Sequence, residues 1–221
     1  YYRIDRYNYY YLLDGYNIGG KREKLDAPEG DNYQQISVAY VSDNSYFGMT
    51  APMQGSRSRF QAEKYFGSFD VLTTLIDFRQ YFKLRPVSLA FRFYNYGMYG
   101  KDAESGVIPP FYLGYPWLIR GYENISYSGN DFLTGETFNV SRLSGTRIMV
   151  ANAEVRLPFT GPERLALIKS KWLFTDLNLF VDAGVAWNSG SKMTFVQDLS
   201  KGVDGSYRFP VISTGASLRI N

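Results

Sequence analysis

Few residues of the kinds that enzymes use as nucleophiles or bases occur in this sequence. It contains no cysteine and no histidine, which excludes disulfides, Cys- or His-based zinc sites and Ser-His or Cys-His couples. Asp176 and Asp182 share one face of a predicted strand, but six residues of strand separate them by about 20 Å, too far for a carboxylate dyad. We therefore expect no enzymatic activity, no cofactor and no metal ion.

The charge distribution gives no sign of a nucleic-acid partner. The 221 residues include 24 Lys and Arg against 21 Asp and Glu, for a net charge of +3. The basic residues are spread along the chain instead of forming a tail or a patch. The aromatic content of 18%, with 20 tyrosines, is the unusual feature.

Alternation of apolar and polar residues predicts strands throughout the chain. The eight predicted segments are Tyr1–Leu12, Tyr33–Ser42, Ser56–Phe66, Phe69–Leu84, Pro86–Gly97, Arg147–Leu157, Lys171–Trp187 and Ser206–Asn221. A soluble sandwich and a membrane barrel both fit an apolar face opposite a polar one. The runs exceed the typical five or six residues of globular strands by about twofold or more, and tyrosines gather at their ends, which favours the barrel.

One connection differs from the other loops. The linkers at 67–68 and 85–86 are short, and those at 15–32 and 188–206 are long and polar. The connection from 100 to 144 contains the apolar stretch 108–122. Because such a segment must pack against something, we expect this loop to fold into the barrel interior.

Three motifs resemble those of the BamA-like superfamily, the bacterial surface antigen barrels that assemble or translocate proteins at outer membranes. Residues 119–122 read I-R-G-Y, similar to the family signature on its sixth extracellular loop. Residues 180–184 read F-V-D-A-G, like its F-x-D-x-G motif, and residues 152–159 match N-x-E-x-R-x-P-F. The stretches 65–67 and 77–79 also match the family, and the lead-in at 113–117 is most similar to members with a β-propeller before the barrel.

The resemblance implies an all-β fold, a transmembrane antiparallel barrel of which residues 1–221 form about eight strands of a probable sixteen. The whole chain would be part of one barrel domain, with N-terminal domains and closing strands outside it. The implied location is the bacterial outer membrane. The implied partners are outer-membrane lipid, accessory outer-membrane or periplasmic subunits, and client β-barrel or secreted proteins.

The resemblance also implies that the loop arginine contacts the acidic residue of the F-x-D-x-G motif. A charge confined in a partly dry lumen needs such a partner, and Glu154 faces the same side as Asp182. We call the contact of Arg120 with Asp182 and Glu154 the loop lock. The alternative is that Arg120 forms a chance ion pair on the surface of a solvated loop. The expected site residues are Ile119, Arg120, Gly121 and Tyr122 in the loop, Asp182 and Glu154 as acceptors, and Phe180, Gly184, Asn152 and Arg156 in support.

Two further expectations concern the neighbourhood of the lock. We expect Tyr122 to pack on Gly184, which has no side chain. Asp77, Arg79 and Arg92 could form a ladder of charges in the lumen, but we expect them to be ordinary solvated lining.

Two functions remain open at this point. The first is an assembly or translocation factor that inserts or translocates proteins, with a gate between the first and last strands that pairs with client strands. The alternative is a barrel that anchors a separate domain, or serves it as a pore, without insertase activity. A soluble sandwich is a more remote interpretation.

Overall fold

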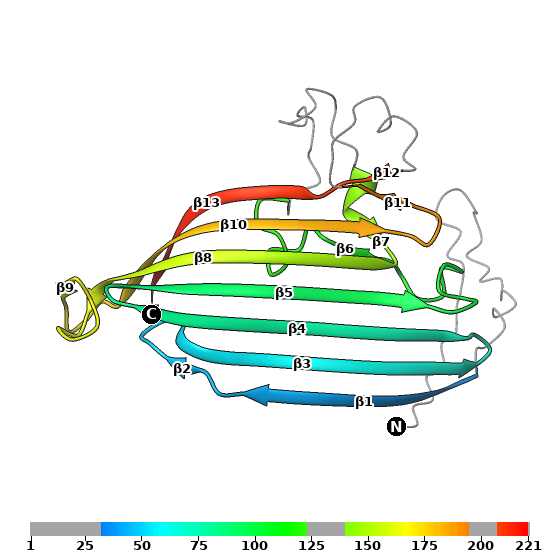
Figure 1. Cartoon of the computed structure of the whole chain (residues 1–221), viewed down its shortest axis with the longest axis horizontal. Coiled ribbons are helices and arrows are strands. Elements are labelled where there is room, and N and C mark those ends of the chain that lie inside the picture. The colour runs from blue at the N-terminus through cyan, green and yellow to red at the C-terminus, as the bar shows by residue number, and fades with distance from the viewer. Residues whose placement is uncertain (1–31, 123–139, 195–206, 221) are drawn as a thin grey trace, which may run out of the picture.

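The computed structural model describes residues 32–122, 140–194 and 207–220. Its main body is a nine-stranded sheet in which seven long strands lie side by side (Figure 1). In sheet order these are β1 (Tyr33–Asp43), β3 (Pro52–Gly67), β4 (Val71–Leu84), β5 (Val87–Tyr99), β8 (Arg147–Gly161), β10 (Thr175–Trp187) and β13 (Val211–Ile220). Neighbouring long strands are antiparallel throughout.

Short elements complete the described chain. β2 (Tyr46–Phe47) pairs with β3, and β9 (Ile168–Lys169) pairs with β8. Two small separate sheets join β6 (Phe111–Tyr112) to β7 (Ser144–Gly145) and β11 (Lys192–Met193) to β12 (Tyr207–Arg208). One 3₁₀ helix, η1 (Val140–Leu143), precedes β7. In the described residues no helix is long and apolar enough to cross a membrane.

The sheet is an open, partial antiparallel barrel, which confirms the expected fold class. Within the described residues β1 and β13 are its two edges, and they do not pair with each other. Seven of the eight predicted strands correspond to long strands, and the predicted strand at 1–12 lies outside the described residues. The connections at 68–70 and 85–86 are short, as predicted.

Four strand boundaries differ from the prediction by four residues or more, and one of them is the start of β3, at Pro52 instead of Ser56. β10 begins at Thr175 instead of Lys171 because the Ser170 hydroxyl accepts hydrogen bonds from the backbone N–H groups of Trp172 and Leu173, which form a turn. The predicted strand at 206–221 is broken before Val211, next to Pro210, which has no N–H to donate. β8 runs on to Gly161 and is irregular where it pairs with Thr175 and Asp176.

The two faces of the sheet have different chemistry. On β10, Leu177, Leu179 and Val181 are exposed on one side, while Asn178 and Asp182 on the other side are completely buried. Cross-strand partners share a face, so Leu179 continues through its partner Val155 to Leu89 on β5. We call this apolar side the outer face, and the opposite side the inner face.

The core lies between the inner face and the loop that follows β5. Leu113, Leu118 and Ile119 of the loop are fully buried against a cluster of apolar residues on the wall. These wall residues are Tyr94, Ile148, Val150, Ala186 and Val211. The described part of the 100–144 loop therefore packs on the inner face of the sheet.

Candidate functional site

The loop segment 117–122 crosses the inner face over β5, β8 and β10 and carries Arg120 to the wall. Arg120 donates from Nε to Asp182 Oδ2 at 2.7 Å and from Nη2 to Oδ1 at 2.6 Å. Its backbone N–H donates to the same Oδ2 at 3.2 Å. A planar guanidinium that grips both carboxylate oxygens is a strong and directional pair. The structure thus brings together the two residues from the I-R-G-Y and F-x-D-x-G motifs.

Asp182 is completely buried and has more than one partner. Asn152 donates from Nδ2 to Asp182 Oδ1 at 2.8 Å and to the backbone carbonyl of Leu118 at 2.8 Å. The ring of Phe180 lies under the Arg120 guanidinium, whose Cζ is 3.6 Å from the ring centroid. These donors offset part of the free energy that it costs to remove a carboxylate from water.

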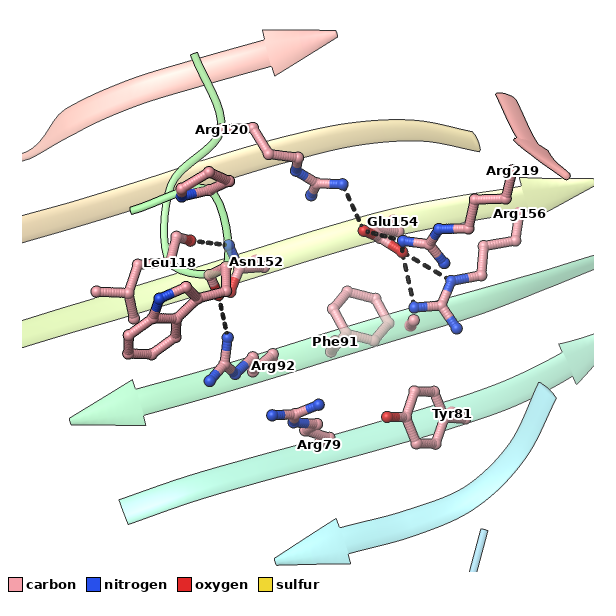
Figure 2. Close-up of a pocket in the computed structure, with 13 residues that line it drawn as sticks. Arg79, Tyr81, Phe91, Arg92, Leu118, Arg120, Asn152, Glu154, Arg156 and Arg219 are labelled. Carbon is pink, nitrogen blue, oxygen red and sulfur yellow. Dashed lines mark hydrogen bonds and ion pairs between the residues drawn. The ribbon is translucent and has the colours of Figure 1, made fainter. Parts of the chain in front are cut away.

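Glu154 joins the loop to two further arginines (Figure 2). Arg120 Nη1 donates to Glu154 Oε1 at 2.6 Å, and Arg156 Nε donates to Oε2 at 2.7 Å. Arg219 on β13 reaches both oxygens from Nη2, at 3.1 and 3.2 Å. Arg156 also donates to the Pro52 carbonyl at 2.9 Å, so the network extends to β3.

The contact on Gly184 differs from the expectation. The side chain over Gly184 is that of Ile119, whose Cδ1 lies 2.5 Å from where a Cβ on Gly184 would stand. Tyr122 instead donates from its hydroxyl to the Ile212 carbonyl on β13 at 3.0 Å. The cause is the turn at Gly121, whose φ of +88° favours glycine and directs the chain toward β13.

The charged residues of β4 and β5 also differ from the expectation of ordinary solvated lining. Asp77 accepts hydrogen bonds from Arg79 at 3.1 and 2.7 Å and from Arg92 at 2.9 and 3.0 Å. Arg92 then donates from Nη1 to the Trp117 carbonyl at 2.6 Å. Arg92 is therefore a loop-holding residue that the motif analysis missed. The sequence signal that could have found Arg92 is its position on the same face of the sheet as Asp77 and Arg79.

Two further contacts hold the loop near its start and near its end. The backbone N–H of Ser189 donates to Glu104 Oε1 at 2.6 Å, and this bond lowers the pKa of Glu104. Thr146 N–H donates to Asn188 Oδ1 at 2.9 Å. These contacts tie the loop after β5 to the turn after β10.

The arrangement is suited to holding a loop. No group of three metal-ligating side chains occurs among the described residues. The two carboxylates of the lock accept hydrogen bonds from arginine and asparagine donors on all four oxygens. What the site can do is fix the loop backbone to β5, β8, β10 and β13 together.

Comparison with known protein families shows to which family the chain belongs. The family model of the Omp85 superfamily domain matches residues 2–221. The chain belongs to the Omp85 superfamily. Omp85 proteins are outer-membrane proteins of assembly and translocation that generally work with partner and client proteins, so the match confirms the superfamily expected from the motifs. No curated protein sequence matches the chain.

Proposed function

We propose that this chain forms part of a single integral outer-membrane barrel domain that assists the insertion or translocation of proteins at the bacterial outer membrane. The observation that carries the proposal is the bidentate contact of Arg120 with the fully buried Asp182. It joins two segments 62 residues apart, in a chain that belongs to a superfamily of assembly and translocation proteins.

The lock has a mechanical role in this proposal. A barrel that opens along one edge can pair with a client strand through its free backbone groups. While that edge is open, the remaining strands must keep their places. Arg120 resists their displacement because it contacts β8 through Glu154 and β10 through Asp182. In this mechanism the residues of the lock hold the loop and keep the strands aligned, and no step requires a covalent reaction.

The test is a client-insertion assay with the full-length protein in liposomes. We expect the wild-type protein to speed the insertion of an unfolded β-barrel client. Asp182→Asn should slow insertion several-fold because the neutral amide cannot satisfy the arginine. Asp70→Asn is the matched control, since Asp70 forms a solvent-exposed pair with Lys64 away from the lock.

The outcomes separate the two candidate functions. If the wild-type protein does not speed insertion, the barrel serves as an anchor or pore and the proposal is wrong. If the wild-type protein and correctly folded Asp182→Asn speed insertion equally, the assembly function stands and the lock has no part in it.

A further inference from the structure

A cavity of about 260 Å³ lies on the inner face beneath the loop. Five arginines line it, and each comes from a different segment of the chain (Figure 2). They are Arg79 on β4, Arg92 on β5, Arg120 in the loop, Arg156 on β8 and Arg219 on β13. The only carboxylate that lines the cavity within the described residues is Glu154.

The arginines outnumber their acidic partners. In the described part of the chain, the carboxylates that bond to these five arginines are Asp77, Glu154 and Asp182. Asp176 lies opposite Arg219 in register but accepts a hydrogen bond from the Thr50 hydroxyl. Five guanidinium groups against three bonded carboxylates leave two positive charges uncompensated, and one even if Asp176 is counted.

The surplus is concentrated on two residues. The side chains of Arg79 and Arg219 are 35% and 34% exposed, whereas those of Arg92 and Arg156 are 15% and 11% exposed. Arg219 contacts Glu154 through Nη2 alone, so its Nε and Nη1 have no partner in the described residues. Tyr81, beside Arg79, adds a phenol to the lining (Figure 2).

We propose that this cavity binds a phosphate group. Converging guanidinium forks match the geometry and charge of a phosphate oxyanion, and they bind it more strongly than they bind a monovalent carboxylate. A doubly charged phosphate would balance the two surplus positive charges. The group can belong to free phosphate or to a lipid phosphomonoester, because both present the same oxyanion.

The test is a binding measurement on the full-length protein in a nonionic detergent. Inorganic phosphate is titrated at constant ionic strength, with acetate as the monovalent comparison, and binding is followed by calorimetry and by thermal unfolding. We expect saturable binding of phosphate that is tighter than that of acetate. Arg219→Gln and Arg79→Gln should each weaken it by about tenfold, the effect of losing one charge-assisted contact.

Arg57→Gln is the matched control, because Arg57 pairs with Asp43 at 2.9 Å and does not line the cavity. If Arg219→Gln fails to fold, Arg219→Lys keeps the charge but loses the fork, and it should weaken binding less. A second arm replaces phosphate with short-chain phosphatidic acid. Binding of inorganic phosphate supports a free ion, and binding of phosphatidic acid alone supports a lipid headgroup. Failure of both probes, or equal weakening in the Arg57→Gln control, overturns the proposal.

Discussion

At the scale of single residues, the pair of Arg120 and Asp182 is the most consequential contact of the site. Asp182 has no exposed surface and accepts bonds from the Arg120 side chain, the Arg120 backbone and Asn152. Removing one partner of a buried pair typically costs about 3–5 kcal/mol, because the other charge is left uncompensated. Loss of one partner therefore destabilises the protein mainly because the other charge is left unpaired, and the net energy of the intact pair is the smaller effect.

We expect Asp182→Arg to lower the temperature at which the folded protein unfolds in detergent, because it places two guanidinium groups together. Adding Arg120→Asp should restore part of the loss. Recovery stays partial because the new carboxylate at position 120 faces Glu154, which now bonds to Arg120 at 2.6 Å. Heat-dependent mobility on a gel measures both variants. An unchanged unfolding temperature in the single variant would contradict the lock.

Gly184 offers a second test of loop packing. A Cβ at this position would stand 2.5 Å from Ile119 Cδ1 and 3.1 Å from the Met149 carbonyl. We expect Gly184→Ala to destabilise the protein by about 1–3 kcal/mol through overpacking. Ile119→Val in the same chain should recover part of this, because it removes the nearer atom. Gly190→Ala, where nothing lies within 4 Å, is the control, and urea unfolding is the measurement.

The sequence predicted some of these contacts and not others, for physical reasons. The faces of β10 follow from a period of two, so the alternation of residues alone places Asp182 on the inner side. The sequence could not predict that Ile119, and not Tyr122, packs on Gly184, because this contact depends on the turn at Gly121. Arg92 was missed because its loop partner is a backbone carbonyl, which no side-chain motif marks.

At the scale of elements, β4, β5, β8 and β10 each have a mainly apolar outer face and carry charged side chains on the inner face. Leu179 on β10 is 57% exposed and Leu167, in the turn between β8 and β10, is 56% exposed. In water, arginine at either place would be tolerated equally. In a bilayer, Leu179 faces hydrocarbon in mid-strand, where an arginine costs about 2–4 kcal/mol near the midplane.

We therefore expect Leu179→Arg to destabilise the protein in liposomes far more than Leu167→Arg does. Urea unfolding of both variants in the same lipid gives the comparison. Similar losses in the two variants would mean that the outer face of β10 is not in contact with lipid.

At the scale of the whole molecule, every long strand from β1 to β13 has exposed apolar side chains on the outer face of the sheet. Its exposed members include Val38 on β1, Phe78 on β4 and Leu218 on β13. An apolar surface this extensive is far larger than soluble monomers expose. Within the described residues its two edges do not meet.

We expect the native protein to stay in the membrane fraction through high-salt and alkaline washes and to be extracted only by detergent. Lipid contact over the outer face is the reason, since neither wash replaces hydrocarbon. Immunoblots of washed membranes provide the measurement. Release into the alkaline wash would favour the soluble sandwich.

The contacts along the loop segment 117–122 also bear on how the barrel avoids errors of assembly. Every second residue of β10 faces outward, and from position 177 to position 187 each of these residues is apolar. Lipid would therefore tolerate β10 displaced by two residues against β8, because a two-residue slip keeps each side chain on its own face. Such a slip would move Asp182 by about 7 Å along the strand. Arg120 could then no longer reach Asp182 and Glu154 together. The folded-in loop thus favours the correct register of β10 against β8, which the alternation of apolar residues alone does not specify.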